Sequence, residues 1–281
     1  MKNIIIALAI LLASHTASAQ VRTPQASPKA TVTQMVGLTE VVLDYSRPSV
    51  KGRTIFGDLV PFGKLWRTGA NQNSMVSFSE DVVIAGQTLK KGKYAIFTTP
   101  KADNWDIVFY SDTNNWGTPE NWSDANVALR TTAKAEMLNR NVESFTIGIN
   151  NLDNNYGHLE ISWEKTMVSI RFEVPTQKTA IASIEKALAG PSAGDYFSSA
   201  QYFYQSNGDM NKALTYVNKA LELSADKPFY YYRQKSLIQA KLGDKRGAIE
   251  TAKVSLAAAQ KANNADYIKM NQDSISEWSK K

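Results

Sequence analysis

The hydrophobic pattern of this chain changes its period once, near Pro175. Before that proline, apolar residues recur at every second position, as Leu43 and Tyr45 do, which is the period of a half-buried β-strand. After it they recur four residues apart, as Ile184 and Leu188 do, which is the period of an amphipathic helix. The chain is therefore predicted to be an α+β protein with strands over residues 30–175 and helices over residues 176–281.

The first of these regions reads as a series of short strands. The runs with period two lie near 31–36, 40–45, 74–79, 81–85, 93–99, 105–110, 126–134 and 144–149, and Gly, Asn and Asp separate them. Many short strands at such spacing favour a sandwich or an open barrel. We predict a mostly antiparallel β-sandwich over residues 30–175.

The last two strands of this region predict a hairpin. If residues 165–166 form a two-residue turn, Trp163 faces Val168 and Ile161 faces Ile170, so that every apolar residue meets an apolar one. A register slip of one residue would destroy this match.

The helical region contains an internal repeat of 35 residues. Asp209 aligns with Asp244, each after a glycine and each suited to begin a helix as its N-cap, and Ala213 aligns with Ala248. This pattern resembles the tetratricopeptide repeat (TPR), a helix–turn–helix unit with small residues where its helices touch. The resemblance implies a surface for a protein partner. A final helix is predicted over residues 265–278.

The first nineteen residues are predicted to be a signal peptide. The positively charged amino terminus and Lys2 precede a nine-residue apolar run, residues 4–12. Ala17-Ser18-Ala19 then fits a cleavage site after Ala19. That run is too short to span a membrane. Residues 20–29 read as a tether. We expect a periplasmic or secreted protein that does not span the membrane.

Charge is distributed unevenly between the two regions. Residues 20–175 hold 16 Lys and Arg against 16 Asp and Glu, whereas residues 176–281 hold 15 against 10. Nucleic acid is a poor partner for an exported chain. The excess of basic residues in the helical region predicts either a solvated helical face or an acidic partner.

The residues of common catalytic and metal sites are scarce. The chain has no cysteine, and His158 is the one histidine beyond the signal peptide. Zinc sites need several His, Cys or carboxylate ligands. The segment from Gly57 to Leu65 has the wrong spacing for a phosphate-binding P-loop. We therefore predict no catalytic residue, no metal site and no cofactor.

The best candidate for a binding site is the long, cationic stretch of residues 45–71, because long charged loops inside a compact domain tend to be functional. Arginines on a shaped loop bind carboxylate, phosphate or sulfate groups. The predicted ligand is small and anionic or sugar-like, and the predicted ligand-binding residues are Arg47, Lys51, Arg53, Trp66, Arg67 and Asn71. Alternatively, these cations pair with Asp44, Asp58 and Glu80 and simply fix the loop.

A second loop carries two tryptophans. Trp116 and Trp122 lie in a polar segment between strands, where an exposed indole ring can stack on the face of a sugar. The alternative is that the rings fold back and fill the end of the sandwich.

Several longer segments of the sequence resemble the sequences of one protein family. They are Tyr45-Ser-Arg-Pro-Ser-Val-Lys-Gly-Arg53, Leu59-Val-Pro-Phe-Gly-Lys64, Trp66-Arg-Thr-Gly-Ala-Asn71 and Trp163-Glu-Lys165. In this order they resemble the exported bacterial family known as domain of unknown function 2911, over about residues 27–175. No catalytic residue can be carried over to this chain from the resemblance.

Together these features predict a non-enzymatic binding or assembly factor of the cell envelope. Its β-domain would bind the ligand and its helices would bind an envelope protein. One alternative is a hydrolase of envelope glycans or peptides that uses Asp44 or Glu80. Another is a purely structural scaffold.

Overall fold

The structure, a computed structural model, describes residues 23–187 and 191–280. The chain divides into two compact units with the boundary between Thr176 and Gln177, and we name them the β unit and the helical unit. The predicted signal peptide (residues 1–19), its cleavage site and the first three residues of the predicted tether lie outside the described residues. Of the helices in the described ranges, none is long and apolar enough to cross a bilayer.

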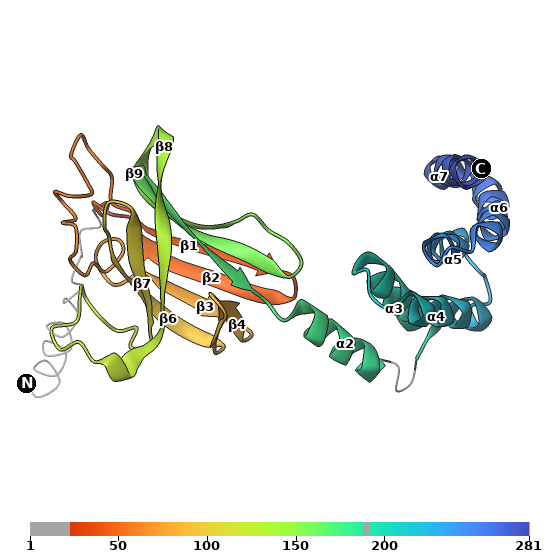
Figure 1. Cartoon of the computed structure of the whole chain (residues 1–281), viewed down its shortest axis with the longest axis horizontal. Helices are drawn as coiled ribbons and strands as arrows, with labels where there is room; N and C mark the ends of the chain where they lie inside the picture. The colour runs from red at the N-terminus through yellow and green to blue at the C-terminus, as the bar shows by residue number, and fades with distance from the viewer. Residues whose placement is uncertain (1–22, 188–190, 281) are drawn as a thin grey trace, which may run out of the picture. The chain divides into compact units, whose positions relative to one another are not determined.

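The described part of the β unit contains nine strands that form one antiparallel sheet (Figure 1). The strands follow the order β1-β2-β3-β6-β7-β8-β9-β4-β5 across the sheet. Their bounds are β1 (Lys29–Val36), β2 (Thr39–Ser46), β3 (Met75–Phe78), β4 (Val82–Ile84), β5 (Gln87–Leu89), β6 (Gly92–Thr99), β7 (Asn104–Tyr110), β8 (Val127–Asn150) and β9 (Tyr156–Glu173), with a short 3₁₀ helix η1 (Asp124–Asn126) before β8.

The α+β organisation is confirmed, but the strands do not form the two separate sheets of a sandwich. Hydrogen bonds connect all nine described strands in one open sheet. The reason lies in β8, which pairs with β7 through residues 127–134 and with β9 through residues 135–150. Two of the predicted short strands, 126–134 and 144–149, are therefore parts of one long strand that joins the sheet together.

The two ends of β9 lie side by side, because the strand folds back on itself. Val174 N donates to Asn155 O at 2.8 Å, and the Arg171 guanidinium lies 4.3 Å from the centroid of the Tyr156 ring. Between them Glu164 has a φ of +55°, a conformation that tight hairpin turns require. The predicted fold-back is confirmed. Its register was wrong by two residues, since the prediction places residue 157 opposite residue 174.

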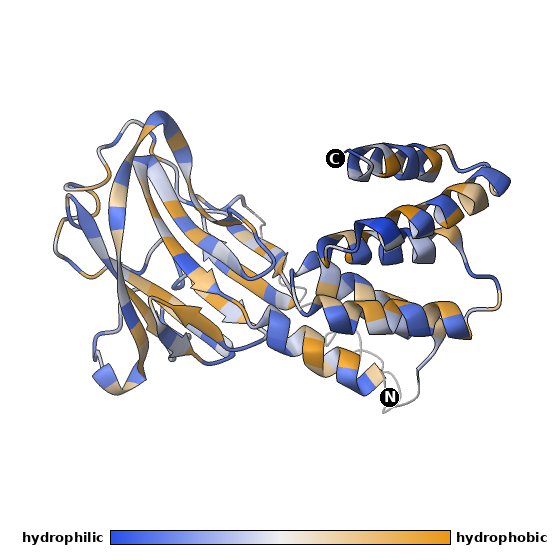
Figure 2. Ribbon diagram, turned by 45° about the vertical axis from the view of Figure 1, so that its right-hand side comes forward, coloured by the Kyte–Doolittle hydropathy of each residue, from blue (hydrophilic) through white to orange (hydrophobic). Residues whose placement is uncertain are grey.

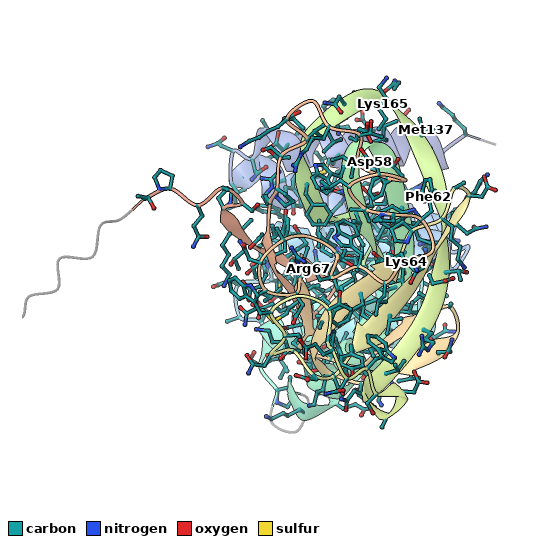
Figure 3. The ribbon with its side chains drawn as sticks, turned by 90° about the vertical axis from the view of Figure 1, so that its left-hand side faces the viewer. Asp58, Phe62, Lys64, Arg67, Met137 and Lys165 are labelled. Carbon is teal, nitrogen blue, oxygen red and sulfur yellow. The ribbon has the colours of Figure 1, made fainter. Side chains whose placement is uncertain are left out.

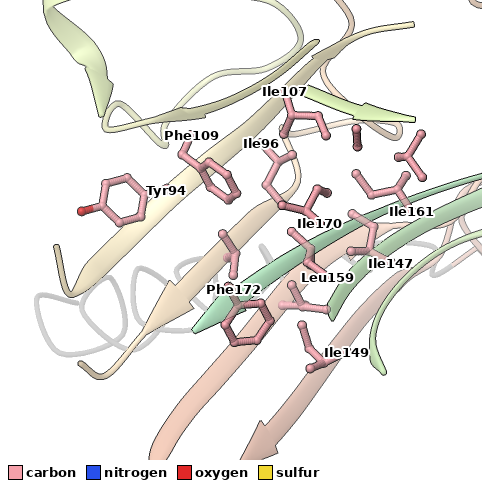
Figure 4. Packing of buried hydrophobic residues seen from close by; sticks show 14 of the residues in the cluster. Tyr94, Ile96, Ile107, Phe109, Ile147, Ile149, Leu159, Ile161, Ile170 and Phe172 are labelled. Atoms are coloured by element: carbon pink, nitrogen blue, oxygen red, sulfur yellow. The ribbon is translucent and has the colours of Figure 1, made fainter. Parts of the chain in front are cut away.

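One apolar core lies inside the curved sheet. Ile96 of β6 and Ile107 of β7 pack opposite Ile147 of β8 and Ile161 of β9 (Figure 4). Ile55, from the long loop between β2 and β3, is also fully buried in this core. Burying an aliphatic side chain of this size stabilises the fold by about 1.5–3 kcal/mol, so Ile55 anchors the loop to the sheet.

The described part of the helical unit contains six helices. They are α2 (Thr176–Ala187), α3 (Ala193–Gln205), α4 (Met210–Leu223), α5 (Phe229–Lys241), α6 (Lys245–Lys261) and α7 (Ala265–Trp278). Consecutive helices pack in pairs, α3 on α4 and α5 on α6. Figure 2 shows apolar and polar residues interleaved along these helices, as expected when each helix buries one face.

Several predictions for the helices are confirmed. The Asp209 carboxylate accepts from the backbone N–H groups of Asn211 and Lys212, and the Asp244 carboxylate accepts from that of Gly247, so both are N-caps. Ala213 and Ala248 are fully buried, as expected for residues that allow two helices to approach closely. The final helix, α7, has the predicted bounds.

Candidate functional site

The loop between β2 and β3, residues 47–74, is fixed to the sheet on both sides. Ser49 pairs with Ser144 of β8, and Trp66 pairs with Thr98 of β6. The second pairing consists of two backbone hydrogen bonds, from Trp66 N to Thr98 O at 2.8 Å and from Thr98 N to Trp66 O at 3.0 Å. The loop therefore has a defined shape although it contains no regular strand or helix.

Two carboxylates fix the loop through its backbone. Glu143 Oε1 accepts from Lys51 N at 2.9 Å, and Glu164 Oε2 accepts from Ile55 N at 3.3 Å. Both glutamates come from the region where β8 and β9 pair. These two contacts use backbone N–H groups of the loop and not the charged ends of its side chains.

The cations of the loop form no ion pairs with the described residues. Across residues 23–187 and 191–280, the salt bridges within 4.0 Å leave out Arg47, Lys51, Arg53, Lys64 and Arg67. Asp44 instead lies 3.6 Å from Lys29 Nζ and 3.7 Å from Lys93 Nζ. The alternative is therefore wrong about ion pairs with Asp44, Asp58 and Glu80. Arg47 and Arg53 do help to fix the loop, but through hydrogen bonds to backbone carbonyl groups.

Four of the six predicted site residues line one cavity of about 390 Å³, which we name the loop cavity. Figure 3 shows the end of the β unit where this loop lies, with Arg67 and Lys64 labelled. The lining includes Lys51, Arg53, Trp66 and Arg67 from the loop, Trp163 from β9 and Ser27 from the segment before β1. Among the described residues, no Asp or Glu lines this cavity.

Two of the lining residues each have a side-chain nitrogen atom that is buried without a hydrogen-bond partner among the described residues. These atoms are Arg67 Nε and Trp163 Nε1. Both carry a hydrogen and are donors only. A buried donor without an acceptor costs about 1–3 kcal/mol, so an acceptor atom that reached either N–H group would stabilise it.

Aromatic rings form the inner wall of the loop cavity. The Trp66 and Trp163 rings are stacked, with centroids 6.1 Å apart and planes inclined by 13°, and Phe145 lies edge-on to Trp66 at 5.5 Å. Trp163 is 2% exposed, so packing fixes its ring and the direction of its N–H group. The cavity thus combines an apolar wall with positively charged and N–H donor groups.

Arg47 and Asn71 have other positions. Arg47 Nε donates to Phe145 O at 3.0 Å and its Nη2 donates to Thr146 Oγ1 at 2.8 Å, so this side chain connects the loop to β8. Asn71 Nδ2 donates to Ser27 O at 3.2 Å and so fixes the segment before β1. Both residues lie beside the loop cavity and support its walls.

Arg53 has a mixed role. Its Nε donates to Val50 O at 3.0 Å and its Nη2 donates to Ser49 O at 2.6 Å, while the residue also lines the loop cavity. The guanidinium group has further N–H groups that a ligand can use. Arg53 therefore both shapes the loop and contributes positive charge.

The residues considered for hydrolysis lie elsewhere. Asp44 and Glu80 are absent from the lining of the loop cavity. A hydrogen bond from Thr31, together with Lys29 and Lys93, lowers the pKa of Asp44 below its ordinary value, so it remains a carboxylate. His158 Nδ1 lies 3.0 Å from Ser169 Oγ on the sheet. Within the described ranges, no group of three or more His, Asp or Glu residues is arranged to hold a metal ion.

Sequence reasoning missed two features of the cavity. Trp163 was expected only to face Val168 in the hairpin, because its place in the wall depends on how β9 folds back. Gly69 was not expected to line the cavity, although the glycine in Trp66-Arg-Thr-Gly-Ala-Asn71 pointed to a special backbone conformation. Its φ is +138°, and Thr68 before it has a φ of +57°.

The tryptophans of the second loop differ from each other. The Trp122 ring stacks on Tyr110 with centroids 4.4 Å apart, so it packs against the outer face of the sheet. Trp116 is 80% exposed. The alternative expectation is therefore correct only in part, because Trp122 folds back onto the outer face of the sheet and does not fill the end of a sandwich, while Trp116 does not fold back.

A comparison with protein families gives one match, described as protein of unknown function (DUF2911), which covers residues 27–172. The matched segment includes the loop, every residue that lines the loop cavity except Ala26, and nearly all of the sheet. No curated protein and no solved structure matches this chain. Because the family match covers half of the sequence, the chain belongs to the DUF2911 family.

Proposed function

We propose that this chain is an exported, periplasmic or secreted protein of the cell envelope that binds a small anionic ligand in the loop cavity. The signal-like residues 1–19 support the export. The binding role is a non-enzymatic one, in which the β unit recognises the ligand and the helical unit binds a protein partner.

The observation that best supports ligand binding is that Arg67 and Trp163, which line one cavity, each have a buried N–H group without a partner among the described residues. Lys51, Arg53 and Arg67 add positive charge that no described carboxylate within 4.0 Å neutralises. Carboxylate, phosphate and sulfate groups supply several acceptor atoms and a negative charge, which match both properties. A ligand of this class would satisfy the donors that the fold leaves without partners.

The test uses the mature full chain with inorganic phosphate, sulfate and galacturonate as separate probes. The six tryptophans give six indole N–H signals in a ¹⁵N NMR spectrum, and Trp163→Phe identifies the signal of Trp163. We expect at least one probe to shift that signal. Arg67→Met should weaken the binding at least about tenfold, because a hydrogen bond to a charged group contributes about 1.5–3 kcal/mol.

Lys64→Met is the matched control. Lys64 is an exposed cation of the same loop and is not among the described residues that line the cavity. Its replacement should change the affinity by less than about twofold, as expected for an exposed charge screened by salt. The proposal is wrong if no probe moves the Trp163 signal, or if Lys64→Met weakens binding as much as Arg67→Met.

For the helical unit we propose a TPR-like protein-binding role. The 35-residue repeat, the two aspartate N-caps and the buried Ala213 and Ala248 support it, because these features are typical of stacked helical hairpins. Arg233 is a candidate residue for contact with the proposed protein partner. Burial lowers the pKa of its guanidinium group, which donates to Ser274 Oγ at 3.0 Å and has no carboxylate within 4.0 Å in the described ranges.

A further inference from the structure

We infer that the ligand of the β unit is an acidic oligosaccharide whose neighbouring sugar ring stacks on Trp116. This inference rests on the proposed anion binding in the loop cavity and specifies the class of ligand. Its starting point is a second cavity beside the first, also of about 390 Å³, which we name the Trp116 cavity.

The two cavities share a wall. Ala26 and Ser27 line both of them. On the other side, the consecutive residues Ala70 and Asn71 divide between them, since Ala70 lines the loop cavity and Asn71 lines the Trp116 cavity. The hydrogen bond from Asn71 to Ser27 O joins these two segments. A ligand longer than one sugar can therefore contact both cavities.

The Trp116 cavity has a different chemistry from the loop cavity. Its polar lining consists mainly of uncharged groups, the amides of Gln25, Asn71 and Gln72 and the hydroxyl groups of Ser27 and Ser46, with Lys29 as its one described cation. Amides and hydroxyls both donate and accept, which matches sugar hydroxyl groups. The loop cavity, with its cations and N–H donors, matches a carboxylate.

Trp116 is exposed although its backbone is firmly held. Asn115 N donates to Asn73 Oδ1 at 2.9 Å, and Asn73 N donates to Asn115 O at 3.1 Å. Asn73 is 1% exposed, so this pair connects the tryptophan loop to a buried position. The ring of Trp116 nevertheless remains 80% exposed at the edge of its cavity.

A large apolar ring on a fixed backbone is a suitable platform for a flat ligand. The C–H face of a pyranose is apolar while its edge carries hydroxyl groups, so it can stack on an indole and still bind polar neighbours. A simple anion such as phosphate would use the loop cavity alone. A uronic-acid oligosaccharide would place one carboxylate in the loop cavity and the next ring on Trp116.

The test compares chain lengths in calorimetric titrations of the mature full protein. The probes are galacturonic acid and its trimer, hyaluronan fragments of two and four sugars, and neutral galactotriose. We expect the longer acidic member of at least one series to bind about tenfold more tightly than the shorter one, because it adds the contact with Trp116. Galactotriose should bind at least tenfold more weakly than that acidic oligosaccharide.

Trp116→Ala should abolish the advantage of the longer acidic sugar over the shorter one. Phe62→Ala is the matched control, because Phe62 is a 47% exposed aromatic residue that is not among the described residues lining either cavity. This variant should keep the advantage.

The outcomes separate this inference from the proposed function. If the shorter acids bind and shift the Trp163 indole signal but no longer sugar gains affinity, the oligosaccharide inference is overturned and anion binding stands. The oligosaccharide inference is also overturned if galactotriose binds as tightly as the acidic oligosaccharide. It is overturned as well if the longer acidic sugar keeps its higher affinity in the Trp116→Ala variant. If no acidic probe of any kind binds, the proposed function itself fails.

Discussion

Arg67 and Trp163 both line the loop cavity, and the backbone next to Arg67 is held in an unusual conformation. Thr68, next to Arg67, is fully buried and has a φ of +57°, which is rare for a β-branched residue. Its Oγ1 lies 3.0 Å from Thr98 Oγ1, and its carbonyl accepts from Ser74. Such strain persists only where the surroundings fix it, and it tends to mark functional sites.

Gly69 is the residue at which this conformation is most sensitive to substitution. A Cβ atom there would lie 2.9 Å from Ser74 Oγ and 3.3 Å from Ser46 O, and the φ of +138° is strained for any other residue. We expect Gly69→Ala to lower the free energy of unfolding of the β unit by about 1–3 kcal/mol. Urea unfolding followed by tryptophan fluorescence measures this change, since five of the six tryptophans lie in the β unit.

Gly63→Ala is the matched control for this substitution. Gly63 also has a positive φ, +73°, but a Cβ atom there would meet no described atom within 4 Å. Its cost should be limited to the backbone, about 1 kcal/mol, the strain of a side chain in the left-handed region. Equal urea midpoints for the two variants would show that the close contacts of Gly69 do not matter.

The sequence predicted only some of the residues that line the loop cavity, and individual residues show what it could not predict. The cationic loop with Trp66 and Arg67 was recognisable, because long charged loops inside a compact domain are unusual. Arg47 belonged to the same pattern, yet its guanidinium binds Phe145 O of β8. Which arginine lines the cavity and which binds the sheet depends on contacts nearly a hundred residues apart in the chain.

At the scale of elements, the pairing of β8 and β9 determines both the shape of the sheet and the wall of the cavity. The alternation of apolar residues predicted the fold-back of β9 correctly. It did not fix the register, because a shift of two residues leaves every side chain on the same face. The left-handed conformation of Glu164 places the turn, and a glutamate there is not a recognised turn signal.

A network of charges connects three of the other strands. Asp44 of β2 accepts from Thr31 Oγ1 of β1 at 2.6 Å and lies near Lys29 of β1 and Lys93 of β6. The hydrogen bond from Thr31 is the largest cause of the lowered pKa of Asp44, and the two lysines add to it. The network therefore favours the charged form of Asp44 in the folded state.

This lowered pKa predicts how stability depends on pH. Because the pKa is lower in the folded state than its ordinary value of 3.8, the contribution is complete above pH 3.8 and is lost as the pH falls through the folded pKa. Asp44→Asn should lower the free energy of unfolding near pH 7 by up to about 1 kcal/mol, since both lysines are largely exposed. The difference from the wild-type protein should shrink below pH 3.8.

Urea unfolding at several pH values checks this prediction. Asp106→Asn is the charge control, because it also removes an exposed carboxylate of the sheet that has one lysine partner, Lys101. A difference between wild type and Asp44→Asn that stays constant from pH 7 to pH 2 would contradict the prediction.

For the whole molecule, the contrast in charge between the units bears on the proposed protein partner. Residues 20–175 are neutral overall, whereas residues 176–281 carry five more basic than acidic residues. A surface of one charge attracts partners of the opposite charge and is sensitive to salt. The proposed envelope partner is therefore expected to be acidic and to contact the helical unit.

Co-purification from envelope extracts tests this expectation with three chains, residues 20–281, residues 20–175 and residues 177–281. We expect an acidic protein to be retained by the first and third chains and to be released as ionic strength rises from about 0.1 to 1 M, where the screening length falls from about 10 to 3 Å. The full chain with Arg233→Met should retain less of it, whereas Lys253→Met, which removes an exposed lysine paired with Glu250, should not. Circular dichroism must first show that each shorter chain folds. Retention of the same protein by residues 20–175 alone would place the contact on the β unit and contradict the division of roles proposed for the two units.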